Sequence, residues 1–155
     1  MPTKVSRASN AANIVEKILL TEVEKLDQLD KVKIEQPGTV KNYTLGHARG
    51  ALLILYGGSS YSKTDERNNA VIMKRDIVIS IVVWIRHFDK RMAAPDYIDF
   101  VLDAVTEEEI DNTRPEYERK IYPIDDELVE EKNGEWQYIV RVGVPTDYVE
   151  RKYKQ

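Results

Sequence analysis

The chain has 155 residues, of which 42% are hydrophobic and 32% charged, a composition typical of one soluble domain and not of a disordered tail or a fibre. Its net charge of −4 argues against a protein that mainly grips nucleic-acid phosphates, so we expect no sequence-specific nucleic-acid partner. The absence of cysteine excludes disulfides, thiolate metal sites and a cysteine nucleophile. We predict a single domain over residues 1–155, with residues 1–9 and 146–155 as flexible tails.

The hydropathy pattern gives no reason to expect a membrane partner. The longest apolar stretch, residues 77–85, has about half of the roughly 20 residues that a helix needs to cross a bilayer. Residues 1–20 are interrupted by polar side chains and lack the apolar centre of a signal peptide. We therefore expect a cytoplasmic protein.

The first predicted element is an amphipathic helix of about 18 residues. Ser9 or Asn10 is suited to its N-cap, and apolar residues follow at helical spacing: Val15, Leu19, Val23 and Leu26. Residues 32–34 alternate like a short strand, and Pro37-Gly38 indicates a turn. Residues 39–49 have no clear period.

Two strands are predicted in the middle of the chain. Residues 51–56 form an apolar run bounded by glycines, which favours a buried strand that ends at Gly57-Gly58, followed by a long polar loop over residues 59–69. Residues 71–88 form a long strand that is apolar on both faces. Eighteen residues would extend roughly 60 Å, whereas a compact domain of this size is about 40 Å across. We therefore expect a bend or break at residues 74–76, with residues 71–73 in a projecting arm.

The last third of the chain predicts a second helix and a hairpin. Pro95 suits the first position of a helix of about ten residues, and an acidic loop follows over residues 107–119. Residues 120–124 form a short strand, and residues 128–132 pair with residues 136–144 across Asn133-Gly134. Pro145 ends the last strand. This order predicts an α+β fold, with a mixed or mainly antiparallel sheet and two helices on one face.

No motif makes a persuasive active site. Residues 57–64 resemble a phosphate-binding loop, but Ser62 replaces the second glycine and no apolar stripe follows for the helix that would hold the anion. Asp96 with Glu130 and Lys132 would suit a Mg²⁺-dependent nuclease only loosely, because Asp96 also fits a helix start. The two histidines, His47 and His87, lack metal-site spacing. We expect no catalytic, cofactor-binding or metal-binding residues, and no cofactor.

The charge is divided unevenly along the chain. Residues 1–95 carry 15 basic and 10 acidic residues, whereas residues 96–155 carry 8 and 17. Opposite charge on two parts of one subunit suits head-to-tail contacts between copies. The acidic segment that would take part consists of Glu107, Glu108, Glu109 and Asp111. A solvated acidic turn is the alternative interpretation of these residues.

Four segments together resemble the tail terminator, or tail completion, proteins of Mu-like phages and prophages, a family with relatives in contractile injection particles. In residues 50–59, Gly50 leads an apolar strand into a Tyr-x-Gly-Ser corner. The polar loop with the long strand over residues 71–88, the helix around Tyr97-Ile98-Asp99, and the closing strand at residues 134–138 agree with the same pattern. The resemblance covers residues 10–145.

The resemblance implies a protein without enzymatic activity that forms a ring, commonly a hexamer, on the end of a tail tube. Such a ring stops tube and sheath polymerisation and presents a surface to the neck or connector. The implied partners are further copies of the chain, the tail tube protein, and the sheath and neck proteins. The implied location is the cytoplasm of a bacterial host during assembly, and then the virion or tail-like particle.

Two segments are the candidate contact sites in this interpretation. We predict that the polar loop orders against a neighbouring subunit, through Tyr61, Lys63, Asp65, Glu66 and Arg67. The acidic segment named above is the second candidate. A neck or head–tail connector subunit of the same particle remains an alternative, as does a Mg²⁺-dependent nuclease.

Overall fold

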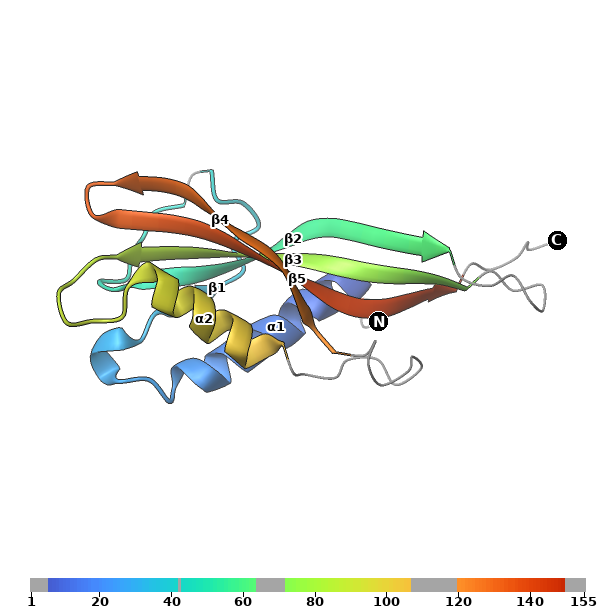
Figure 1. The fold of residues 1–155 in the computed structure, drawn as a ribbon, viewed down its shortest axis with the longest axis horizontal. Coiled ribbons are helices and arrows are strands. Elements are labelled where there is room, and N and C mark those ends of the chain that lie inside the picture. Colours follow the sequence, from blue (N-terminus) through green and yellow to red (C-terminus); the bar gives the residue numbers. More distant parts are fainter. Residues whose placement is uncertain (1–5, 42, 64–71, 107–119, 150–155) are drawn as a thin grey trace, which may run out of the picture.

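The structure is a computed structural model, and it describes residues 6–41, 43–63, 72–106 and 120–149. Figure 1 shows an elongated molecule built on one twisted sheet. The elements in chain order are α1 (Arg7–Val23), a 3₁₀ turn (Gln28–Asp30), β1 (Lys33–Glu35), β2 (Gly50–Lys63), β3 (Ile72–Arg86), α2 (Ala94–Val105), β4 (Tyr122–Lys132) and β5 (Glu135–Val149). Neither of the described helices is long and apolar enough to cross a membrane.

The sheet has five strands in the order β1-β2-β3-β5-β4. β1 pairs with β2 in parallel, and the other neighbours are antiparallel. Both helices lie on the same face of the sheet (Figure 1). The predicted α+β class, with a mixed sheet and a C-terminal hairpin, is confirmed.

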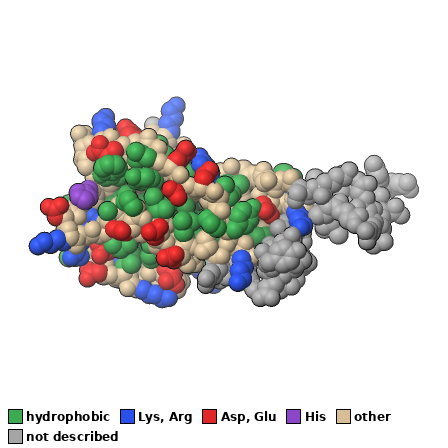
Figure 2. All heavy atoms as spheres, viewed as in Figure 1, with side chains coloured by type: hydrophobic (Ala, Val, Ile, Leu, Met, Phe, Trp, Pro, Cys, Tyr) green, Lys and Arg blue, Asp and Glu red, His purple; other side chains and the backbone are tan. Residues whose placement is uncertain are grey.

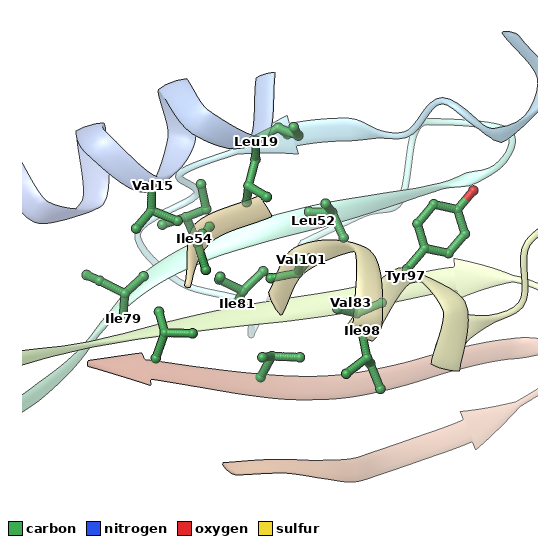
Figure 3. Packing of buried hydrophobic residues seen from close by; sticks show 14 of the residues in the cluster. Val15, Leu19, Leu52, Ile54, Ile79, Ile81, Val83, Tyr97, Ile98 and Val101 are labelled. Atoms are coloured by element: carbon green, nitrogen blue, oxygen red, sulfur yellow. The ribbon is translucent and has the colours of Figure 1, made fainter. Parts of the chain in front are cut away.

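The main core lies between the two helices and β3. The odd-numbered residues of β3 from Ile77 to Ile85 are completely buried, because they face the helices. Figure 3 shows Leu19 of α1 and Val101 of α2 directed toward Ile81 of β3. The alternation read from the sequence therefore identified the core face of the central strand.

The opposite face of the sheet is covered in part by the irregular segment that precedes β2. Leu45 packs in a smaller cluster with Leu53 and Val82, and the Tyr43 ring lies 5.8 Å from the Trp84 ring. Burial, together with a hydrogen bond to Glu35, raises the pKa of Tyr43 to about 12. Residues 39–49, which show no clear period in the sequence, thus cover part of the second face of the sheet.

The raised pKa of Tyr43 predicts a loss of stability at alkaline pH. The folded chain holds this phenol neutral, while the unfolded chain releases its proton near pH 10, so its contribution is complete below pH 10 and is lost between pH 10 and 12. Thermal melts from pH 9 to 12 should show the melting temperature of the wild type falling more steeply than that of Tyr43→Phe. Parallel curves for the two proteins would contradict the prediction.

The two helix starts differ slightly from the sequence prediction. Ser6, and not Ser9 or Asn10, caps α1, because its hydroxyl accepts a hydrogen bond from the Ser9 N–H at 3.0 Å. α2 begins at Ala94 with Pro95 as its second residue, and the Asp96 carboxylate accepts from the Ala93 N–H at 2.8 Å. Asp96 therefore acts as a helix cap in the structure.

Three strands continue through positions where the sequence predicted an end or a break. β2 passes through Gly57-Gly58 with a β-bulge, so residues 59–63 are strand and not loop. β3 runs unbroken through residues 74–76, because it is paired there on both sides. β5 continues past Pro145, which lies beyond the last pair of β4 and β5 and remains paired with Asp76 of β3.

These extensions build a three-stranded arm. β2, β3 and β5 run together past the start of α1 and project from the body of the molecule (Figure 1). The sequence predicted an arm at residues 71–73 from the length of the strand alone. The structure confirms that the strand overhangs, and the arm also contains residues 59–63 and 143–149.

The C-terminal hairpin was predicted correctly at its turn. Asn133 and Gly134 have φ values of 54° and 77°, which are the positive values of a type I′ turn. The strand before the turn differs from the prediction, since residues 122–132 form one strand and not two short ones. Two bulges, at Ile124 and Val129, accommodate the continuous pairing.

The two predicted tails are only partly outside the regular elements. Residues 7–9 lie in α1, and residues 146–149 lie in β5. Residues 1–5 and 150–155 lie outside the described part of the chain.

Candidate functional site

The bulge in β2 determines which side chains the arm presents. Tyr56 pairs with Ile79 before the bulge and Ser59 pairs with Ile77 after it, so both lie on the face of the sheet that carries the helices. Gly58 takes a φ of +100° there, a value that L side chains rarely adopt. One extra residue reverses the alternation, and it thereby brings Tyr61 to the same face as Tyr56.

Arg75 of β3 joins these side chains into one cluster. Its Nε donates to the Ser59 hydroxyl at 3.1 Å and its Nη2 donates to the Tyr56 hydroxyl at 3.4 Å. The guanidinium carbon lies 5.7 Å from the centre of the Tyr61 ring, which is cation–π distance. We call Tyr56, Ser59, Tyr61 and Arg75 the arm patch.

The arm patch is ordered by its own contacts and still exposed. The Tyr56 and Ser59 hydroxyls are 2.7 Å apart, and their hydrogen bond, with that from Arg75, lowers the pKa of Tyr56. Tyr56 and Tyr61 nevertheless remain 51% and 53% exposed. A hollow of about 540 Å³ between the start of α1 and β2 reaches Tyr56. Two aromatic rings fixed around a cation and left half exposed are suited to binding a partner.

The predicted contact loop is only partly described. Tyr61 and Lys63 belong to β2. Asp65, Glu66 and Arg67 lie outside the described residues. The prediction that this segment orders against a neighbouring subunit stays a prediction, although the strand over residues 59–63 exists within the single chain.

β4 forms the second exposed surface. Every residue of this edge strand is exposed, including Ile124, Leu128 and Val129 at 43%, 53% and 49%. The strand also carries five acidic side chains, Asp125, Asp126, Glu127, Glu130 and Glu131. On the face seen in Figure 2, hydrophobic and acidic side chains are interspersed.

The acids of β4 differ in their pairing. Arg141 of β5 donates to Asp125 at 2.8 Å and to Glu127 at 2.9 Å, and these two carboxylates raise its pKa. Asp125 and Glu127 lie on the face of the sheet away from the helices. Asp126 pairs across the strands with Val140 and therefore lies on the helix face, where no described residue forms an ion pair with it. We call Asp126, Leu128 and Glu131, which share the helix face, the acidic edge.

The acidic segment predicted from the sequence lies elsewhere in the chain. Glu107, Glu108, Glu109 and Asp111 are outside the described residues. Residues 123–131 are also rich in acidic side chains, but they were not predicted as a contact surface. The aliphatic residues between these acids could have indicated a contact surface, because a fully solvated turn has no need of exposed aliphatic side chains.

Tyr122 connects the acidic strand to the base of the arm. Its hydroxyl donates to the Asp76 carboxylate at 2.6 Å. The ring crosses Gly143, where a Cβ would lie 2.3 Å from the ring, so only glycine leaves room for it. This contact holds β4 against the strands of the arm on the face away from the helices.

The motifs considered for catalysis are placed as follows. Residues 57–63 of the phosphate-loop resemblance lie in β2, so this part of the segment is strand and not loop. Asp96 caps α2, and Glu130 and Lys132 lie in β4. His47 accepts a hydrogen bond from the Arg49 N–H, and His87 is exposed beside Asp89. Among the described residues no group of three or more His, Asp and Glu side chains is arranged to hold a metal ion.

The sequence was also compared with known protein families and with curated proteins. The model of a family described as Gp37 protein matches residues 23–155, a range that contains all five strands and α2. No curated protein matches the chain.

Proposed function

Because the chain belongs to the Gp37 family of phage proteins, we propose that it is a tail terminator, which forms a ring on the end of the tail tube. The ring would stop polymerisation of the tube and its sheath, and its outer side would bind the neck. The partners in this proposal are five further copies of the chain, the tail tube protein, and the sheath and neck proteins.

The observation that carries the proposal is the presence of two different exposed surfaces on one subunit. The arm patch combines aromatic rings with a cation, while the acidic edge combines an aliphatic side chain with carboxylates. Contacts between unlike surfaces repeat from subunit to subunit, and they close into a ring when the rotation between copies allows it. The resemblance to Mu-like terminators supports the same assembly.

The proposal includes the absence of enzymatic activity and a location. The protein would act in the cytoplasm of a bacterial host and then remain in the virion or tail-like particle. The use of Asp96 as a helix cap favours a structural role for the carboxylate that the nuclease interpretation would need.

The test is whether the protein limits the growth of tail tubes. Tube protein of the same phage is polymerised with and without the purified chain, and tube lengths are measured by electron microscopy. We expect shorter tubes with extra density at one end. Tubes of unchanged length and bare ends, together with binding to portal-side proteins, would favour the connector instead.

Two solution measurements complement the capping test. Light scattering at low and physiological salt should give a mass near six times 17.9 kDa, decreasing with salt if charged contacts join the copies. Incubation with DNA and Mg²⁺ should leave the DNA intact. Cleavage that is lost in Glu130→Ala and Lys132→Ala would overturn the non-enzymatic proposal.

A further inference from the structure

The turn of the β4–β5 hairpin borders a hollow on the face of the sheet away from the helices. Its volume is about 370 Å³. Gln137 of β5 pairs with Trp84 of β3 on one side and with Glu130 of β4 on the other, so the three side chains form a row across this face. We call this site the hairpin hollow, and its lining consists of Trp84, Glu130, Lys132, Asn133, Glu135 and Gln137.

Trp84 gives the hairpin hollow a fixed aromatic surface. Its indole N–H donates to the Glu135 carboxylate at 2.8 Å. The Tyr43 ring lies 5.8 Å from the Trp84 ring, and the indole also packs against the cluster that contains Leu53 and Val82. Because these contacts already hold the indole in place, a ligand that stacks on it loses little affinity to side-chain ordering.

The polar side chains of the hairpin hollow are available for a ligand. Glu130 and Lys132 are exposed, and Gln137 is half-buried. Within the described part of the chain, the side chains of these three residues form no hydrogen bond or ion pair. Glu135 directs one carboxylate oxygen to Trp84, which leaves its second oxygen for another donor.

This combination of groups suits a cation, and in particular a guanidinium. Glu130 and the second oxygen of Glu135 supply negative charge, and the amide oxygen of Gln137 can accept a further hydrogen bond. A guanidinium is planar, so it can stack on the face of an aromatic ring while its N–H groups bind a carboxylate beside the ring. Lys132 opposes such a ligand by its charge, but its flexible side chain lets the ammonium turn into solvent.

A second copy of the chain is a poor source of this guanidinium. The arginines in the described part of the chain already have interactions within it: Arg7, Arg49, Arg75, Arg86, Arg91 and Arg141. Bringing one of them into the hollow of a neighbouring copy would first require those interactions to break. Charge complementarity therefore favours an arginine from a different protein.

We propose that the hairpin hollow binds an arginine side chain of a different protein, with the guanidinium stacked on Trp84 and paired with Glu130. This inference rests on the proposed function, in which each subunit meets tube, sheath and neck proteins, and it names the chemistry by which one of them is recognised. Glu130 lies on the opposite face of β4 from the acidic edge, so binding in the hollow leaves the acidic edge accessible.

Nuclear magnetic resonance of the indole N–H groups tests the proposal. The chain has two tryptophans on opposite faces of the sheet, since Trp136 packs against the core beneath the helices. Trp84→Phe identifies the Trp84 signal by its loss. A capped Gly-Arg-Gly peptide is titrated to millimolar concentration into the isotope-labelled chain. We expect a saturable shift of the Trp84 signal, with the Trp136 signal unchanged.

The matched ligand is the same peptide with citrulline in place of arginine, which keeps the shape of the side chain and removes its charge. We expect the citrulline peptide to bind about tenfold more weakly, which corresponds to about 1.4 kcal/mol. Equal binding of the two peptides would overturn the proposal. So would a Trp84 signal that neither peptide shifts.

Two substitutions at exposed positions of the hollow should have opposite effects on the affinity for the arginine peptide. Glu130→Gln removes the paired carboxylate and should weaken binding about tenfold. Lys132→Gln removes a like charge and should strengthen binding about twofold. An unchanged Trp136 signal checks that each variant is folded. Reversed effects would indicate an anionic ligand, and weaker binding in both variants would indicate that shape and not charge matters; either result would contradict the proposal.

Binding to the particle proteins separates this inference from the proposed function. Purified tube, sheath and neck proteins are each tested with the wild type and with Glu130→Gln, and we expect one of them to lose about tenfold in affinity with the variant. Unchanged affinities, in a chain that limits tube growth, would retain the terminator and overturn the arginine site. Binding of the arginine peptide by a chain that leaves tube growth unchanged would retain the site and overturn the terminator. A ring that dissociates in Glu130→Gln would show that the occupant is a second copy, against the proposal.

Discussion

Gly50→Ala is expected to destabilise the fold by about 3–5 kcal/mol, the sum of an overpacked site and an unfavourable backbone angle. Gly50 begins β2 with a φ of +151°. A Cβ there would lie 2.4 Å from the Trp84 carbonyl oxygen and 2.8 Å from the Ile85 Cδ1. Because Trp84 and Ile85 belong to the central strand, the backbone has little freedom to move away.

The measurement is thermal or urea unfolding of the variant beside Gly38→Ala. Gly38 also has a positive φ, +73°, but a Cβ there meets no atom within 4 Å. Gly38→Ala should lower the free energy of unfolding by only about 1–2 kcal/mol, since it introduces the backbone strain without the clash. At roughly 2–4 °C per kcal/mol for a domain of this size, the two melting temperatures should be clearly separated. Equal losses of stability in the two variants would contradict the prediction, because they would show that β3 moves away from the added Cβ at Gly50 without an energetic cost.

The fold could be predicted from the sequence wherever a periodic pattern was buried. The alternation in β3 and the spacing of Val15, Leu19 and Val23 in α1 each identified the face that packs in the core. The Asn133-Gly134 turn was predictable because its backbone angles restrict the residues that fit.

The predictions that were wrong concern places where tertiary pairing overrides a local signal. Gly57-Gly58 usually ends a strand, but pairing with β3 on one side carries β2 through it as a bulge. Pro145 ends most strands, but here it lies where β4 no longer covers β5. Neither position can be interpreted without knowing which strand is the neighbour.

The arm patch could not be predicted from the sequence, for the same reason. Tyr61 was predicted as a contact residue of a loop, and Arg75 as part of a break in a strand. Their meeting depends on the one-residue shift of the bulge, which turns Tyr61 toward the helix face beside Arg75. Sequence reasoning identified the unusual segment but not the partner across the sheet.

The buried Arg49 was not singled out by the sequence, and it leads to the second large prediction. Its side chain is only 3% exposed, between the rings of Phe88 and Tyr97, at 5.3 and 5.7 Å from their centres. Nε donates to the Tyr97 hydroxyl at 3.2 Å and Nη1 donates to the Arg86 carbonyl at 2.7 Å. Nη2 finds no acceptor within the described part of the chain. The cluster joins β2, β3 and α2 at the end of the sheet away from the arm.

Arg49→Ala should therefore cost about 3–4 kcal/mol, because it removes two hydrogen bonds and leaves a cavity between two aromatic rings. Arg49→Met should instead remain within about 1 kcal/mol of the wild type, because methionine fills the space and removes the desolvation cost of a buried cation. Free energies of unfolding from urea titration measure both variants. If methionine is as damaging as alanine, the hydrogen bonds of Arg49, and not its volume, hold β2, β3 and α2 together at this end of the sheet.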